Sequence, residues 1–158
     1  MRNKKSISTA EALGKLQKIC SLQEKCAADV VLLLKRWGIE PQQHQDIIDR
    51  LRADTFMDES RFAAAFVRDK IHFDHWGIIK INYFLKQKGI SKKVIQEVLN
   101  TIDLGEYTGM IRRELEKKKK TLKGTPRERW AKLARYGTSR GYEMDYMREY
   151  LGEIDSDE

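Results

Sequence analysis

Long hydrophobic runs, cysteine and proline are all scarce in this sequence of 158 residues. The longest run of Val, Ile, Leu, Met or aromatic residues, Val30 to Leu34, is five residues long, whereas a helix that spans a membrane needs about 20. No hydrophobic segment follows the basic start of the chain, so the sequence has no pattern typical of a secretory signal. We therefore expect no membrane association and a location in the cytoplasm.

The two cysteines and two prolines carry further expectations. Cys20 and Cys26 lie in an amphipathic stretch without the paired spacing of a zinc site or of a redox Cys-x-x-Cys motif, so we predict reduced thiols in the core. Low proline content, with abundant Lys, Glu, Leu, Ala, Gln and Arg, favours helix, because these side chains lose little rotamer freedom in a helix.

Motifs for catalysis are also missing. The sequence contains no GxSxG, no phosphate-binding GxxxxGK[ST] and no paired Cys and His of a nucleophilic site. His72, Asp74 and His75 form the one cluster of residue types that bind metals, but their spacing is poor and no second group of ligands accompanies them. We predict that the protein is not an enzyme and carries no metal or cofactor.

Charge is abundant and unevenly distributed. Charged residues make up 35% of the chain and hydrophobic residues only 41%, which favours a thin, extended packing over a thick core. The net charge is +7, yet Arg112 to Arg140 alone carries twelve basic residues against three Glu, an excess of +9. Seven acidic residues and one arginine follow between Glu143 and Glu158. This pattern predicts a polyanionic partner, or a partner with an acidic face.

An internal repeat organises the chain. Gly38, Gly89 and Gly141 occur in similar surroundings, 51 and 52 residues apart. Apolar residues stand eight and five positions before each glycine: Val30 and Leu33, Ile81 and Phe84, Leu133 and Tyr136. They also stand five, six, nine and ten positions after the last two: Val94, Ile95, Val98 and Leu99, then Tyr146, Met147, Tyr150 and Leu151. In the first repeat, the matching Ile47, Ile48 and Leu51 are displaced by three residues.

Each glycine is expected to end one helix in the left-handed conformation, with the next helix starting two residues later. Ser91, Pro41 after Glu40, and Glu143 are suited to those starts, and Asp58 is suited to capping an earlier helix in the middle repeat. We predict an all-α fold of nine helices, in three tandem three-helix repeats with an elongated, curved arrangement. The predicted divisions are residues 8–53, 54–103 and 104–152, followed by an acidic tail at 153–158.

The middle repeat contains Asp58-Glu59-Ser60-Arg61-Phe62-Ala63, Phe66, Arg68, Gly77, Ile81, Leu85, Lys88-Gly89-Ile90 and Ile95. Together these residues resemble the central motif of the RecX family of regulatory proteins. Ser139-Arg140-Gly141-Tyr142 is similar to the closing signature of that family. The resemblance covers residues 10 to 152, and Ile78 stands where the family commonly has proline.

The resemblance implies a modulator of the RecA recombinase. Family members lie in the helical groove of the RecA filament on single-stranded DNA, where they bridge protomers and inhibit filament growth, strand exchange and ATP hydrolysis. It therefore implies two partners, the RecA filament and single-stranded DNA, the latter bound directly or through the filament. We expect a monomer. The alternative is an independent nucleic-acid-binding protein that uses its helix hairpins as helix-turn-helix elements.

The candidate contact residues are basic. The first group lies in the third repeat: Lys117, Lys118, Lys119, Lys120, Lys123, Arg127, Arg129, Lys132, Arg135 and Arg140. The second group lies in the middle repeat: Arg61, Arg68, Lys80, Lys86 and Lys88. Plain solvated helix faces are the competing interpretation, and Arg61 could instead pair with Asp58 or Glu59. Trp130 and Tyr136 lie among the basic residues of the third repeat, as in proteins that stack bases, but both fall in apolar columns that predict core packing.

Overall fold

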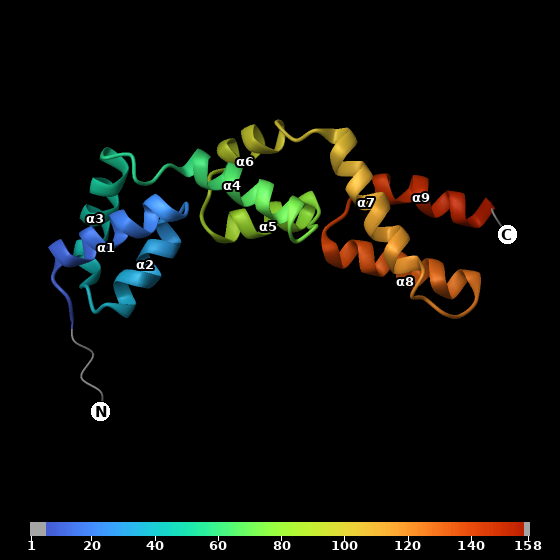
Figure 1. The fold of residues 1–158 in the computed structure, drawn as a ribbon, viewed down its shortest axis with the longest axis horizontal. Coiled ribbons are helices and arrows are strands. Elements are labelled where there is room, and N and C mark those ends of the chain that lie inside the picture. Colours follow the sequence, from blue (N-terminus) through green and yellow to red (C-terminus); the bar gives the residue numbers. More distant parts are fainter. Residues whose placement is uncertain (1–5, 157–158) are drawn as a thin grey trace, which may run out of the picture. The chain divides into compact units, whose positions relative to one another are not determined.

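The computed structural model describes the backbone of residues 6–156 and the side chains of residues 6–152. This part of the chain forms nine α-helices and no strand, which confirms the all-helical prediction (Figure 1). The helices are α1 (Thr9–Leu22), α2 (Ala27–Arg36), α3 (Pro41–Ala53), α4 (Glu59–His72), α5 (Ile78–Gln87), α6 (Lys92–Leu99), α7 (Leu104–Lys119), α8 (Pro126–Arg140) and α9 (Met144–Ser156). In this region, no helix is long and apolar enough to cross a bilayer.

The chain divides into two compact units. The first contains the residues up to Ala65 together with Leu85–Ile95, and the second contains Phe66–Phe84 together with the residues from Gln96 onward. The helices of the middle triplet, α4 to α6, are therefore shared between the two units. The three-repeat division stays a prediction from the sequence.

The three repeat glycines adopt the conformation that the sequence predicts. Gly38, Gly89 and Gly141 have φ angles of 75°, 79° and 88°, in the left-handed region. In each case the N–H of the following residue donates to the carbonyl five positions earlier, at 3.0 to 3.1 Å, as in a Schellman motif. Those following residues are Ile39, Ile90 and Tyr142, and all three are buried. The same local chemistry thus ends α2, α5 and α8.

Predicted caps at two helix starts are also confirmed. The Asp58 side chain accepts a hydrogen bond from the N–H of Arg61 at 2.8 Å, and the Ser91 hydroxyl accepts one from the N–H of Val94 at 3.3 Å. Met57 and Phe62, on either side of the Asp58 cap, are both buried, as expected for a hydrophobic staple.

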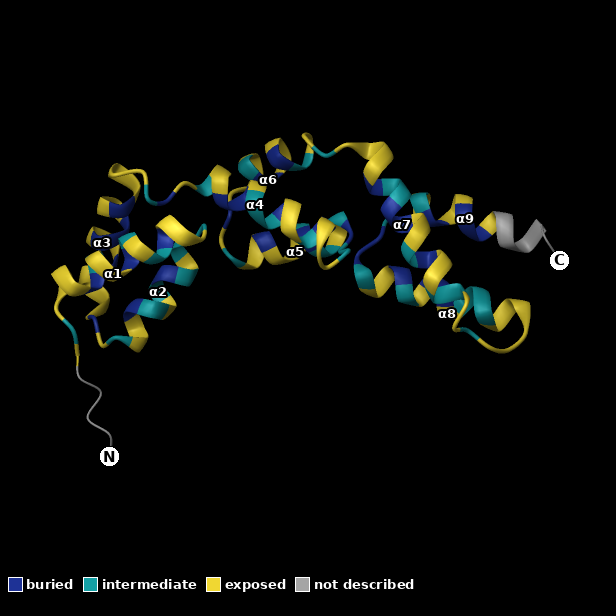
Figure 2. Cartoon of the chain, in the orientation of Figure 1, coloured by how far each residue is buried: buried dark blue, intermediate teal, exposed yellow. Residues whose placement is uncertain are grey.

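The first compact unit is built on a core from α1, α2 and α3. Leu16, Val30, Leu34, Ile48 and Leu51 are among its most buried members. Figure 2 shows buried, dark blue positions on each of the three helices. Cys20 and Cys26 are buried and not bonded to one another, as predicted. Burial raises the pKa of both thiols, which keeps them protonated at neutral pH.

The second compact unit contains α7, α8 and α9, which contact one another. Its most buried side chains include Ile111, Leu115, Leu133, Met147 and Leu151. Leu133 belongs to the first predicted apolar column, which is formed by the residues eight positions before each repeat glycine. The other two members of this column, Val30 and Ile81, are also fully buried.

The second predicted apolar column, formed by the residues five positions before each repeat glycine, is less buried than expected. Leu33 and Tyr136 are only half-buried, and Phe84 is 37% exposed. The buried position lies one residue later, at Leu34, Leu85 and Gly137. A spacing of four from the first column places these residues more directly above it on a helix than a spacing of three does.

Within the second unit, the loop between α4 and α5 docks on the turn between α8 and α9. The N–H of Gly77 donates to the Arg140 carbonyl at 2.7 Å, and the N–H of Ile79 donates to the Gly141 carbonyl at 3.1 Å. The otherwise unpaired N–H groups at the start of α5 are thus satisfied by carbonyls at the end of α8. The Tyr142 hydroxyl adds a bond to the carbonyl of His75 at 2.7 Å.

Tyr107 of α7 completes this junction. Its hydroxyl accepts a hydrogen bond from the N–H of Ile78 at 2.8 Å and donates one to the Glu143 carboxylate at 2.5 Å. Ile78 is the first residue of α5, a position that also suits proline. Proline has no N–H, so the hydrogen bond to Tyr107 depends on this chain having Ile there.

We expect replacement of Glu143 by Gln to remove a pH-dependent loss of stability. Burial raises the pKa of Glu143, so the folded chain keeps this proton to a higher pH than the unfolded chain does. The contribution of this carboxyl is complete below about pH 4.3, the ordinary pKa of glutamate, and is lost as the pH rises through the folded-state pKa. Urea denaturation of both proteins from about pH 4 to about pH 7 measures it. Parallel pH dependence in the two proteins would contradict the prediction.

Candidate functional site

The basic residues of the third triplet, which is formed by α7, α8 and α9, gather at the end of α7, in the following loop and along α8. Lys117 and Lys118 lie in the last turn of α7, Lys120 caps that helix, and Lys123 lies in the loop. Thr125 and Glu128 form a capping box at the start of α8, with Pro126 at the first helical position. The local sequence therefore fixes where the loop ends and α8 begins.

The lysines of α7 have different surroundings. Lys117 is exposed and lies 3.4 Å from Glu114, which makes a weak surface pair. The Lys118 ammonium lies 5.1 Å from the centre of the Tyr136 ring, so this lysine contacts α8. Lys119 is half-buried and Lys120 is exposed. An open groove of about 340 Å³ is lined by Glu116, Lys119, Lys120, Leu122 and Arg129.

On α8, Arg127, Lys132 and Arg135 are exposed. The Lys132 ammonium donates to the Lys123 carbonyl at 3.1 Å, so it also holds the loop against the helix. No ion pair joins Arg127 or Arg135 to a carboxylate among the described residues. Arg129 is half-buried. Lys123, Arg127 and Arg135 are therefore the cations most available to a partner.

Three of the sequence-predicted contact residues are held by groups that are distant in the sequence. Arg61 lies 3.1 Å from Glu24 and donates to the Thr55 carbonyl at 2.8 Å. This pairing differs from the one with Asp58 or Glu59 that the sequence suggests, because the Asp58 side chain caps the helix. Lys88 lies 2.9 Å from Asp29.

Arg140 is the third. Its guanidinium donates to the carbonyls of Asp74 and His75, and it lies 6.0 Å from the centre of the Tyr136 ring. These contacts hold the α4–α5 loop on the end of α8.

The Lys88–Asp29 pair connects the end of α5 with the first turn of α2. Although burial opposes ionisation of Asp29, the hydrogen bond from Lys88 lowers the pKa of this carboxyl. The Asp29 carboxyl therefore stays ionised near neutral pH.

The remaining basic residues of the middle triplet lie in different compact units. Arg68 is exposed and lies 3.5 Å from its neighbour Asp69, and Lys80 lies over the Trp76 ring; both belong to the second unit. Lys86 is exposed and belongs to the first unit. The structure thus brings the predicted residues together only within the third triplet.

Sequence reasoning missed an aromatic cluster in the second unit. Phe66, Trp76, Tyr83 and Phe84 form a chain of ring contacts, and the ammonium groups of Lys70 and Lys80 lie over Trp76. Placing Phe84 in an apolar column hid the cluster. A usable signal was the presence of two apolar pairs at helical spacing on α5, Ile79 with Tyr83 and Ile81 with Leu85, since one helix side cannot bury both.

Trp130 and Tyr136, predicted to pack in the core, are both half-buried. Tyr136 presents its ring to Lys118 and Arg140, which accounts for its partial exposure.

The histidine cluster has internal partners. Asp74 pairs with Lys70 at 3.1 Å, and the His75 ring lies 3.2 Å from the Ile71 carbonyl and 3.8 Å from Glu114. Over the part of the chain that the structure describes, no group of three or more His, Cys, Asp or Glu could hold a metal ion.

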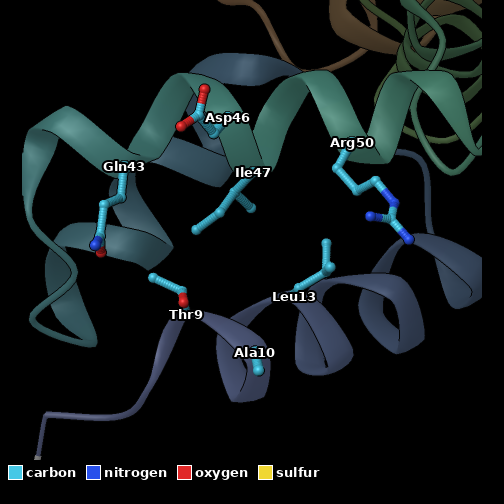
Figure 3. A pocket seen from close by; sticks show the side chains of 7 residues that line it. All are labelled: Thr9, Ala10, Leu13, Gln43, Asp46, Ile47 and Arg50. Atoms are coloured by element: carbon cyan, nitrogen blue, oxygen red, sulfur yellow. The ribbon is translucent and has the colours of Figure 1, made fainter.

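A shallow groove of about 340 Å³ lies between α1 and α3 in the first unit (Figure 3). Leu13 and Ile47 point into the space between the two helices. Thr9, Ala10, Gln43, Asp46 and Arg50 complete the lining.

Comparison with known proteins supports one family. Residues 58–99 match the family model of the second three-helix domain of RecX, and residues 106–151 match that of the third. The chain is 26% identical to the regulatory protein RecX of Prosthecochloris aestuarii over 92% of this chain and 95% of that protein. It is 35% identical to RecX of Clostridium botulinum strain Eklund 17B over 73% of this chain, which spans about half of that relative, 55%.

Two crystal structures share the fold. A structure of a regulatory protein RecX has a TM-score of 0.82 at 23% identity, covering 91% of this chain and 72% of its own. A structure of RecX from Lactobacillus salivarius has a TM-score of 0.74 at 18% identity, covering 92% of this chain and 98% of its own.

Proposed function

Since this chain belongs to the RecX family of regulatory proteins, we propose that it binds the RecA filament on single-stranded DNA and inhibits recombination and ATP hydrolysis by that filament. Members of this family are regulators and not enzymes. The family match carries the proposal, and the basic surface of the third triplet supports it. The protein acts as a monomer in the cytoplasm, where the recombinase and its DNA are found.

The contact surface is centred on the third triplet. We assign direct contact to the exposed Lys117, Lys120, Lys123, Arg127, Lys132 and Arg135, with Arg68 and Lys86 as further exposed cations. Positive charge on this surface steers the protein towards a groove that contains DNA phosphates. Arg61, Lys88 and Arg140 act indirectly, by holding loops and helix ends in place.

We expect the protein to suppress ATP hydrolysis by RecA on single-stranded DNA at concentrations too low to coat the bare DNA. Inhibition requires contact with the filament and does not require the DNA to be covered. The measurement pairs a steady-state ATPase assay with fluorescence anisotropy on the same oligonucleotide without RecA. Full ATPase activity at protein concentrations that saturate the bare DNA would contradict the proposal.

That contrary outcome would favour the second candidate function, an independent nucleic-acid-binding protein. The observation in its favour is the row of exposed cations on α8 without carboxylate partners among the described residues, since such surfaces bind phosphates in any nucleic acid.

A further inference from the structure

A chain of four aromatic rings lies in the second compact unit, on the end of α4, the following loop and α5. The ring centres of Phe66 and Trp76 are 6.4 Å apart, those of Trp76 and Phe84 are 5.0 Å apart, and those of Tyr83 and Phe84 are 5.4 Å apart. Edge-to-face geometry at the two outer contacts, with interplanar angles of 75° and 89°, fixes the rings relative to one another.

The outer part of this chain is exposed. Tyr83 is 57% exposed, Phe84 is 37% exposed, and Ile79, one turn before Tyr83 on α5, is 56% exposed. The helix already buries Ile81 and Leu85, so the packing of α5 in the fold does not need the side that carries Tyr83. We call Ile79, Tyr83 and Phe84, together with the Trp76 ring that contacts Phe84, the aromatic face.

Positive charge accompanies the aromatic face. The ammonium groups of Lys70 and Lys80 lie 4.5 Å and 4.3 Å from the centre of the Trp76 ring. Lys70 also pairs with Asp74, whereas no carboxylate among the described residues pairs with Lys80. A partner at this face therefore meets exposed rings beside an ammonium group that has a ring contact but no carboxylate partner among the described residues.

We propose that the aromatic face binds single-stranded DNA directly, with bases stacked on Tyr83 and Phe84 and with Lys80 against a phosphate. Aromatic rings beside cations are the arrangement that binds single strands irrespective of sequence, because every base has a flat face and every nucleotide carries a phosphate. A duplex does not fit, since its bases are already stacked on one another. This inference deepens the proposed function, on which it rests for the choice of DNA.

The test uses the full chain and a labelled oligothymidylate, with affinity measured by fluorescence anisotropy over a series of salt concentrations. The double variant Tyr83→Leu, Phe84→Leu keeps apolar side chains at both positions but removes the rings. We expect its affinity to fall by about 5- to 150-fold for each base that loses its stacking partner. The slope of log affinity against log salt stays unchanged, because no phosphate contact is lost. In Lys80→Gln that slope becomes shallower by about 0.7.

Matched controls separate stacking from other effects. Tyr83→Phe retains a ring and is expected to bind like the wild type, and Leu104→Ala removes an exposed apolar side chain elsewhere in the same unit, 53% exposed, without effect. An abasic strand of equal length binds the wild type more weakly than the oligothymidylate does, while the double Leu variant binds the two strands equally. Unchanged circular dichroism of the variants shows that the fold is intact.

Wild-type affinity in the double Leu variant would overturn the proposal. Unchanged DNA affinity combined with loss of RecA inhibition would also overturn it, and would assign the aromatic face to a protein partner. Failure of the wild type to inhibit RecA contradicts the proposed function alone, because the comparison of DNA affinities does not involve RecA.

Discussion

Reversing the charge at Lys123, Arg127 and Arg135 to Glu abolishes the inhibition of RecA while the helical content stays near that of the wild type. All three side chains are exposed, so the reversal breaks no internal pair among the described residues and removes only the attraction to a polyanionic groove. Inhibition is measured as ATP hydrolysis on single-stranded DNA, and helical content by circular dichroism. Arg129 and Lys132, which belong to the same predicted basic group, are left unchanged because Arg129 is half-buried and Lys132 holds the loop.

The matched control reverses three exposed lysines outside the basic surface of the third triplet, Lys18, Lys92 and Lys93. Each reversal changes the charge by two, so both triple variants go from +7 to +1. The control is expected to keep most of the inhibition, and any small loss reflects the lower overall charge. Equal loss in the two variants would mean that net charge, and not the surface on α7 and α8, determines inhibition.

Gly141→Ala destabilises the protein much more than Gly89→Ala, although the two glycines occupy equivalent places in the repeat. Both have left-handed φ angles, 88° and 79°, a conformation that costs an alanine about 1–2 kcal/mol. At Gly89 an added Cβ meets no atom within 4 Å, so we expect only that penalty. At Gly141 the Cβ collides with the Lys80 side chain and lies 2.6 Å from its backbone nitrogen.

Overpacking of this kind adds about 1–3 kcal/mol, so the total at Gly141 is about 2–5 kcal/mol. Urea denaturation followed by circular dichroism measures both variants against the wild type. Equal destabilisation by the two substitutions would show that the start of α5 accommodates an added Cβ at Gly141 without further cost, which would contradict the prediction.

The sequence determined the helical architecture of the chain because its signals are local. Left-handed glycines, the caps at Asp58 and Ser91, and the first apolar column each depend on residues within about two helical turns. Their positions could be predicted without knowing what any helix packs against.

The functional assignment of individual cations depended on the tertiary structure. Arg61, Lys88 and Arg140 belong to basic patterns in the sequence, yet their acceptors include Glu24, Asp29 and the Asp74 carbonyl, which are 37, 59 and 66 residues away. Helix periodicity specifies which side of a helix a residue occupies and says nothing about which distant group lies there.

Helix periodicity was equally insufficient to predict the aromatic face. Phe84 fits an apolar column by its spacing, and only the packing of α5 leaves it exposed beside Tyr83 and next to Trp76. Burial is decided by how much of a helix its neighbours can cover, which is a property of the assembled unit. The sequence by itself therefore determined the all-helical class, the glycine-ended turns and the caps beside them, and the tertiary structure alone decided which charged and aromatic side chains remain available for a partner.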